Sequence, residues 1–342
     1  MLKVEIILLT NNVIFPFQQL ERVYNLDFIE LNKLIATQLL AEHGLGFLIN
    51  IIEYKTPKSK GNLIKQIIFD TGGANHTFLH NMDVFNYPIY DLDSIILSHW
   101  HYDHFGALYK VLERLNKKIN VITHEFALFE RIFRRAKDIK DKDLEGKTKE
   151  ELFPLLSSSK IVNQEPLHLE KIKRFGGNVL FQKDLFEIFR MENLRILVSG
   201  EIPRKFKIED FDNFFSLQDN IVKIDKIYDD KCLILEFNEK VVILNGCCHS
   251  GIVNTINYVN GVTNKPISHI IGGFHMANAT KERIKFTLDY LAKLKIYKSS
   301  LFLFPIHCSG DKLIEIINRN DIEGIKAFNA SVGTIFNFYS EK

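Results

Sequence analysis

The hexapeptide from His99 to His104, with the sequence HWHYDH, constrains this chain more than any other stretch. It follows the apolar run Ser94–Leu97, which is typical of a buried strand. Alternate side chains of an extended segment share one face, so His99 and His101 can converge on one metal ion. Asp103 and His104 come where the chain must turn, and they can face a second ion. Chance histidines in a polar turn seldom match ligand types and spacing this densely, so the sequence predicts a metal site.

A strand, a glycine-bearing loop with a histidine, and then a helix recur three more times in the C-terminal half. The histidines of these loops are His249, His275 and His307. Loops at strand ends meet on one side of a packed sheet, and rigid strands hold ligands precisely placed. A single histidine at a strand end is usually a polar residue with its hydrogen bonds satisfied. Several at equivalent positions, beside the HWHYDH motif, favour a shared site.

Composition excludes several classes of function. The 342 residues suffice for one large domain or two ordinary ones, and 46% of them are hydrophobic. The net charge of +2 gives no electrostatic case for nucleic acid or membrane partners. The run Met1–Leu9 carries a glutamate and is typical of a first strand rather than a signal peptide, and no apolar run approaches the ~20 residues that span a bilayer.

The four cysteines do not form a pattern typical of a disulfide framework, which favours a reducing, cytoplasmic setting. Strand edges and an aromatic content of 12% are compatible with a homodimer.

Residues 125–190 differ from the rest because basic and acidic side chains alternate there. Ordinary solvated helices explain this pattern best. The functional alternative is a mobile lid that brings basic groups over an anionic substrate. Because strands resume on both sides, we expect a helical insertion, 125–190, within a single domain that spans residues 1–342.

Four features together resemble the metallo-β-lactamase superfamily: the HWHYDH motif, Asp70 before it, and His249 and His307 after it. This resemblance covers essentially the whole chain apart from the insertion. It implies an α/β fold, the αβ/βα sandwich, in which two mixed β-sheets lie face to face with helices outside. The site is then expected at one edge, between the sheets.

Five stretches resemble more narrowly the branch that includes the archaeal dihydropterin synthases of methanopterin biosynthesis. They are Glu42–Gly44, Gly200–Arg204, Gly246–Ile252, Gly272–His275 and Pro305–Gly310. The resemblance implies a transferase that joins a dihydropterin-methyl diphosphate to an aminobenzene ribofuranosyl phosphate and releases diphosphate. Its substrates are small and phosphorylated. Two alternatives stay open: a metal-dependent hydrolase of a phosphodiester, ester or lactone, and a non-catalytic or redox module that keeps the fold.

The resemblance also implies two divalent metal ions with six ligands, which are His99, His101 and His249 for the first ion and Asp103, His104 and His307 for the second. Such shells suit Zn²⁺, and they also accept Mn²⁺ or Fe²⁺. Most of the superfamily adds a bridging Asp from the strand before the last ligand, but the loop Gly272–His275 has none. Either the bridge is missing or His275 takes part of its work. For Cys247 and Cys308, packing as small buried residues is favoured over metal ligation.

The remaining candidates are polar residues near these motifs. We expect Asp70 to support the metal-binding loop. Proton transfer, or contact with a developing charge, is assigned to His43 and His275. The residues expected to contact substrate are Glu42, Glu201 and Arg204. Among these, the guanidinium is assigned to a substrate phosphate, because it can grip a phosphate with two parallel hydrogen bonds.

Overall fold

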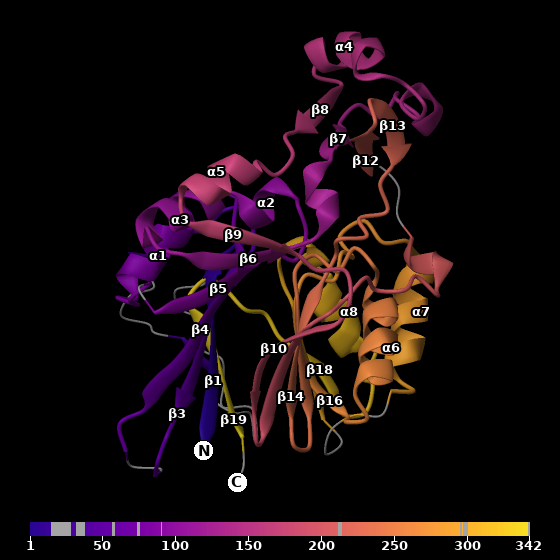
Figure 1. The fold of residues 1–342 in the computed structure, drawn as a ribbon. Coiled ribbons are helices and arrows are strands. Elements are labelled where there is room, and N and C mark those ends of the chain that lie inside the picture. The colour runs from indigo at the N-terminus through magenta and orange to yellow at the C-terminus, as the bar shows by residue number, and fades with distance from the viewer. Residues whose placement is uncertain are drawn as a thin grey trace.

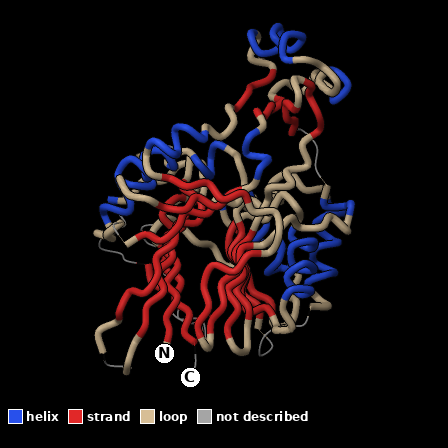
Figure 2. Tube along the Cα trace, viewed as in Figure 1, coloured by secondary structure: helices blue, strands red, loops and turns tan. Residues whose placement is uncertain are grey.

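The computed structural model describes residues 1–14, 29–31, 38–56, 59–73, 76–89, 91–210, 214–294, 296 and 300–340. Its described residues form two large sheets that lie face to face, with helices on their outer sides (Figure 1; Figure 2). A third, smaller sheet projects beyond one end of this sandwich (Figure 1). The predicted αβ/βα sandwich is therefore confirmed.

The first sheet has eight strands among the described residues. In spatial order they are β2 (Ile29–Leu31), β19 (Thr334–Ser340), β1 (Leu2–Thr10), β3 (Gly46–Glu53), β4 (Asn62–Thr71), β5 (Leu92–Ile96), β6 (Ile119–Thr123) and β9 (Gly177–Phe181). Pairing is antiparallel from β2 to β4 and parallel from β4 to β9.

The second sheet has seven strands in the described part of the chain. In order they are β10 (Phe186–Met191), β11 (Leu194–Val198), β14 (Cys232–Phe237), β15 (Val241–Asn245), β16 (Ile267–Gly272), β17 (Leu301–Pro305) and β18 (Ile325–Ala327). The run from β15 to β18 is parallel, so the carboxyl ends of these strands meet at one edge.

Strand β1 shows how the sequence builds the layers. Val4, Ile6 and Leu8 belong to the apolar cluster between the two sheets, whereas Ile7 and Leu9 belong to the cluster beneath the helices. All five are fully buried, as expected for a strand with apolar layers on both faces. A shift of one residue in the strand register would exchange the two faces, so the sandwich fixes the register of the strand.

Helices cover the outer face of each sheet. On the first sheet they are α1 (Thr77–Val84), α3 (Leu108–Leu115) and α5 (Leu169–Arg174). On the second they are α6 (Ile252–Val262), α7 (Lys281–Leu291) and α8 (Leu313–Arg319). None of the described helices is both long and apolar enough to cross a membrane.

The small projecting sheet joins β13 (Ile221–Ile224), β12 (Phe214–Gln218), β7 (Glu130–Arg134) and β8 (Ile161–Gln164). Together with α4 (Lys149–Ser157) it has an apolar cluster of its own. We call this unit, residues 130–164 and 214–224, the arm; it stands at the top of Figure 1.

The expectation of solvated helices over 125–190 is wrong for most of that segment. It contributes β7 and β8 to the arm, and β9 and β10 to the two large sheets. Side chains such as Ile132 and Ile161 are buried in the core of the arm, which the alternation of charges conceals in the sequence.

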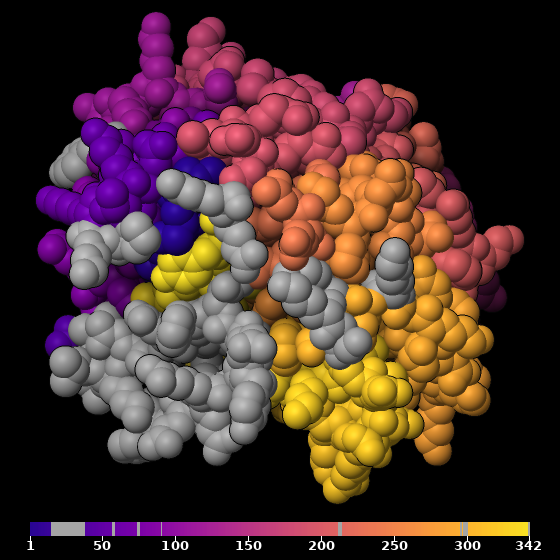
Figure 3. All heavy atoms as spheres, turned by 90° about the horizontal axis from the view of Figure 1, so that it is seen from below, coloured from indigo at the N-terminus to yellow at the C-terminus, as the bar shows by residue number. Residues whose placement is uncertain are grey.

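The two chain ends lie side by side at the opposite end of the sandwich from the arm (Figure 1). Strands β1 and β19 pair in antiparallel fashion from Leu2↔Ser340 to Ile7↔Ile335. The indigo N-terminal and yellow C-terminal segments are also neighbours when the molecule is seen from that end (Figure 3).

Candidate metal centre

The site lies where strands of both large sheets end. Strand β5 runs into the HWHYDH motif, and β15, β16 and β17 run into the loops of His249, His275 and His307. Within the motif, His101 is extended and the short helix α2 (Tyr102–Phe105) starts directly after it. This change of backbone lets Asp103 and His104 face a second group of side chains beside the first, and the His104 ring centroid stays 4.2 Å from that of His99.

The first group of ligands consists of three imidazoles in close contact. His99 Nε2 lies 3.0 Å from His101 Nδ1 and 3.1 Å from His249 Nε2. All three side chains are buried. Burial and neighbouring histidines lower the pKa of each well below its usual value, and Arg131 adds to this at His99 and His101, so the rings are neutral at neutral pH. Neutral rings offer nitrogen lone pairs to a metal ion.

The second group gathers around Asp103. Its Oδ2 atom lies 3.2 Å from His307 Nε2 and 3.8 Å from His104 Nε2. His307 Nε2 is buried and has no partner in hydrogen-bonding geometry. Burial opposes ionisation of Asp103, but His104, His307 and His43 outweigh it and lower the pKa of this carboxyl well below the usual value. The buried imidazole nitrogen and the ionised carboxylate fit a divalent cation.

Asp70 connects the motif to β4. Its Oδ1 accepts from the Ser98 backbone N–H at 2.7 Å, and its Oδ2 accepts from Ser98 Oγ at 2.6 Å and lies 2.7 Å from His104 Nδ1. Burial alone would lower the pKa of His104, but Asp70 and Asp103 raise it to about 9. With Nδ1 bound to Asp70, His104 presents Nε2 to the other ligands, as expected for the supporting role assigned to Asp70.

Four residues at this edge have left-handed backbones, which side chains other than glycine rarely adopt. The φ angles are 57° at Asp70, 61° at Cys248, 48° at His275 and 55° at His307. Each such conformation costs about 1–3 kcal/mol and persists only where its surroundings enforce it. Strained backbones gathered at strand ends are typical of functional sites.

Cys247 lies among the candidate ligands, whereas the sequence favours packing as a small buried residue for it. Its Sγ atom is 3.1 Å from His104 Nε2. It also falls within 4.8 Å of the ligand atoms of both groups, the one around Asp103 and the one of His99 and His249. The only signal for this in the sequence is its spacing two residues before His249.

The arm forms one wall of the site. Phe214 of β12 stacks on His101 with ring centroids 5.0 Å apart, and Phe133 of β7 meets the same ring edge-on at 5.3 Å. The buried Arg131 of β7 lies 3.3 Å from His101 Nε2 and donates to Asp229 at 2.7 Å. Asp229 also accepts from the Trp100 backbone N–H at 2.7 Å, so the arm is tied to the motif through this carboxylate.

A cavity of about 820 Å³ opens onto both ligand groups. This volume lies within the ~300–1,000 Å³ that is usual for small-molecule sites. Besides the candidate metal ligands, the cavity is lined by His43, His275, Phe214, Arg134 and Arg283, among others.

Both histidines assigned to proton transfer reach this cavity. His43 Nε2 lies 3.2 Å from Asp103 Oδ2, and this contact raises the pKa of His43. His275 packs against His249 with ring centroids 4.3 Å apart.

The three residues assigned to substrate do not line the cavity. Glu42 accepts from the Gly73 backbone N–H, and Glu201 lies 3.2 Å from His124 Nε2. Arg204 donates to the carbonyl oxygens of His249, at 2.6 Å, and of Lys226. These contacts hold loops together behind the ligands. The geometry therefore does not support the sequence-based assignment of a substrate phosphate to Arg204.

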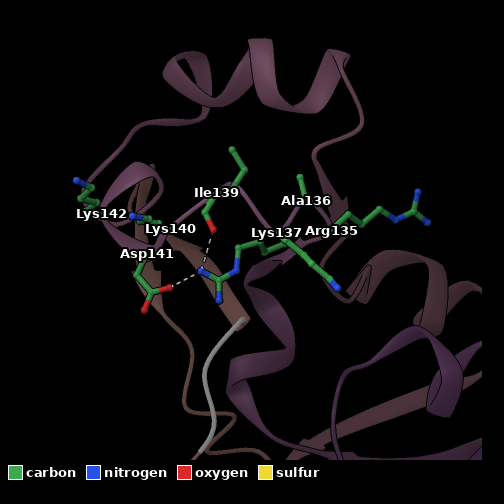
Figure 4. A pocket seen from close by; sticks show the side chains of 8 residues that line it. Arg135, Ala136, Lys137, Ile139, Lys140, Asp141 and Lys142 are labelled. Atoms are coloured by element: carbon green, nitrogen blue, oxygen red, sulfur yellow. Dashed lines mark hydrogen bonds and ion pairs between the residues drawn. The ribbon is translucent and has the colours of Figure 1, made fainter. Parts of the chain in front are cut away.

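A second hollow, of about 750 Å³, lies on the arm and is lined by Arg134 to Lys142 (Figure 4). Arg134 lines both hollows, and its Nη1 donates to the Ile139 carbonyl and to Asp141. Arg135 and Lys142 point to opposite sides (Figure 4), so these cations do not converge on one ligand.

Comparisons with known proteins agree with this arrangement. The family described as the Metallo-beta-lactamase superfamily matches residues 65–176, which include the HWHYDH motif. The 7,8-dihydropterin-6-methyl-4-(beta-D-ribofuranosyl)-aminobenzene-5'-phosphate synthase of Methanocaldococcus jannaschii is 29% identical over 280 residues, which cover 80% of this chain and 82% of that protein. MJ0448, an uncharacterized protein of the same organism, is 29% identical over 285 residues, which cover 82% of this chain and 90% of the relative.

Among solved structures, Tm1679, a metal-dependent hydrolase of the beta-lactamase superfamily, matches with a TM-score of 0.66 and 17% identity. The match covers 99% of this chain and 100% of that one. At this level of identity the likeness shows the fold alone.

Proposed function

Because this chain belongs to the metallo-beta-lactamase superfamily, we propose that it is a metal-dependent transferase similar to the dihydropterin-ribofuranosyl-aminobenzene phosphate synthase. It would join a phosphorylated pterin-type substrate to an aminobenzene ribofuranosyl phosphate and release diphosphate. The observation that carries the proposal is the 29% identity to that synthase over 80% of the chain.

The donor set supports two divalent cations, with Zn²⁺ as the best fit to its imidazole and carboxylate ligands. His99, His101 and His249 would hold one, and Asp103, His104 and His307 the other. When bound, the ions would polarise phosphate oxygens and stabilise the charge that develops on the leaving diphosphate.

The protein's own residues supply positioning and proton transfer. His43 is half exposed at the cavity and is held by Asp103, so it is placed to exchange a proton with the aminobenzene partner. Phe214 and Phe133 give an apolar wall on which a flat pterin ring can stack.

Arg283 replaces Arg204 as our candidate for the substrate's anionic groups. It lines the cavity and is only 6% exposed, and its Nε and Nη2 atoms have no hydrogen-bond partner among the described residues. These two nitrogens form one edge of the guanidinium, the edge that grips a phosphate or carboxylate with parallel hydrogen bonds.

The test is to load the purified protein with Zn²⁺ or Mn²⁺, supply both substrates, and measure diphosphate release together with the coupled product. We expect release that requires both substrates and a bound metal ion. Release without the aminobenzene substrate would identify a hydrolase instead. No turnover by metal-loaded protein with either substrate set would overturn the assignment.

Arg283→Gln provides a sharper control on the substrate. Loss of one bidentate ionic contact is expected to raise KM about 10-fold or more while kcat changes little. Lys285→Gln is the matched variant, since Lys285 lies on the same helix but is exposed and paired with Asp289. Equal KM values for the two variants would remove Arg283 from the substrate site.

A further inference from the structure

Cys247 differs from the other buried cysteines in its surroundings. Cys232 and Cys248 belong to the apolar cluster between the second sheet and its helices, and Cys248 Sγ lies 3.3 Å from Thr255 Oγ1. Cys247 is equally buried, at 3% exposed, but belongs to none of the apolar clusters of the described residues. Its neighbours are metal-ligand atoms, so packing does not explain its position.

The Sγ atom of Cys247 is common to both ligand groups. In one group it accompanies Asp103, His104 and His307; in the other it accompanies His99 and His249. Within each group all ligand atoms lie within 4.8 Å of one another, a spacing compatible with donors that share an ion. Among the described residues, Cys247 is the one member that these two groups have in common.

The neighbouring loop leaves no room for a carboxylate at this junction. A Cβ atom on Gly273 would meet the Gly246 carbonyl oxygen at 2.6 Å and Cys308 Sγ at 2.7 Å, distances that real Cβ atoms essentially never show, and Cys247 Cα at 3.0 Å. Any side chain at Gly273 would therefore collide with the cysteine loops. Thiol side chains therefore lie between the ligand groups, and the Gly272–His275 loop contributes no acidic residue there.

We propose that Cys247 is a metal ligand that bridges the two ions. On binding, the S–H proton passes to solvent and the sulfur forms bonds to both cations, with no change of oxidation state. The proposal rests on the proposed function only in requiring that both ligand groups bind metal. Thiolate ligation also favours Zn²⁺ over harder cations such as Mg²⁺.

The experiment uses the full chain, stripped of metal with a chelator and titrated with Co²⁺. A thiolate bound to Co²⁺ gives a charge-transfer band in the near ultraviolet, whereas imidazole and carboxylate ligands do not. The wild-type protein is expected to bind two ions and to develop this band. Cys247→Ser should lose the band and bind cobalt at least 10-fold more weakly, while Cys248→Ser, its buried neighbour, should keep both.

Each outcome decides the question. A band that persists in Cys247→Ser, or its absence from wild-type protein that holds two cobalt ions, overturns the proposal. Measured metal content separates this failure from that of the proposed function, because a protein that binds no metal at all would contradict both. If Cys247 bridges two ions but the protein shows no turnover, the inference stands and the proposed transferase activity is refuted.

If Cys247→Ser does not fold, wild-type protein still gives an answer. Alkylation with iodoacetamide, located by mass spectrometry, is expected to modify Cys247 in the chelator-treated protein and to be blocked when Zn²⁺ is bound. Cys308, which also borders the cavity, serves as the internal reference. If Cys247 is alkylated to the same extent with and without Zn²⁺, ligation is contradicted.

Discussion

The ligand cluster and the arm are two regions built on opposite principles. The candidate ligands, between residues 99 and 307, follow the ends of three strands, β5, β15 and β17, and owe their geometry to two large sheets. The arm combines two segments, residues 130–164 and 214–224, in short strands that pair with one another and have a small apolar core of their own. The candidate ligands are therefore held by the ends of strands in the two large sheets, whereas the arm forms a wall that packs against one of them, His101.

The two regions meet at His101. Phe214, Phe133 and Arg131, all from the arm, contact its ring. Arg131 is buried between Asp229 and Asp225, at 2.7 and 3.4 Å, and a buried ion pair of this kind fixes geometry more than it adds stability. The base of the arm is thus anchored to the HWHYDH motif.

The largest effect is expected at the centre of the cluster. His99→Ala removes the imidazole that touches both His101 and His249, so we expect one ion to be lost and kcat/KM to fall by about 10³-fold or more. Metal analysis and diphosphate release measure the two effects. His168→Ala, an exposed histidine paired with Glu165, should change neither. An active, fully loaded His99→Ala protein would show that the cluster is not the site.

A smaller effect on metal binding is expected at Asp70, which contacts the candidate ligand His104. Asp70→Asn keeps the shape of the side chain but weakens its hold on His104, so metal affinity should fall about 10- to 100-fold. Competition with a chromogenic chelator measures this. The control is Asn81→Asp, because Asn81 is a buried polar residue of α1 whose side chain donates to the backbone away from the cluster. It tests whether exchanging any buried amide and carboxylate lowers the metal affinity. Identical affinities in wild type and Asp70→Asn would show that Asp70 does not orient His104.

Phe214 and Phe215 are adjacent residues of the arm whose side chains lie on opposite faces of β12. Phe214 packs on His101, while Phe215 is buried in the core of the arm. Phe214→Ala should raise KM about 10-fold with little loss of stability, because it removes a stacking surface. Phe215→Ala should destabilise the arm by about 3 kcal/mol and leave metal content unchanged. Limited proteolysis and steady-state kinetics distinguish the two. Loss of metal in Phe215→Ala would mean that the arm and cluster are not separable.

The smallest effect on the site is expected from a histidine of the core. Burial lowers the pKa of His269 on β16 to about 3, so the folded protein keeps it neutral where the unfolded chain becomes charged. Its contribution to stability is therefore complete above pH ~6.5 and declines below it, by about 2 kcal/mol at pH 5. In His269→Leu the fall in unfolding free energy between pH 8 and 5 should be smaller by that amount, as chemical denaturation can measure. An unchanged pH profile would show that His269 is charged or exposed.

The sequence predicts the cluster well because metal ligation demands few residue types at fixed spacing. The motif and the loops of His249 and His307 are brought together as expected. It predicts the arm poorly. Alternating charges over 125–190 occur on the solvated sides of short strands as readily as on those of helices. The buried face of β7 depends on its pairing with β12, more than 50 residues away in the sequence.

The remaining differences concern side chains whose roles depend on packing. Nothing in the residue type separates Cys247 from Cys248, which face different surroundings because the backbone turns between them. Similarly, Arg204 and Arg283 are equivalent in sequence terms. Only the fold shows that the first is held by backbone carbonyls and that the second borders the cavity.

The pairing of β1 with β19 has a consequence for how the protein is made. Residues 2 and 340 are partners, and β1 also supplies the edge on which β3, β4 and the strand of the HWHYDH motif are assembled. During synthesis β1 emerges before the other strands described here, and its partner β19 (Thr334–Ser340) emerges only after more than 320 further residues have followed β1. The nascent first sheet must therefore wait with an unpaired edge, a state that chaperones protect from association with other chains.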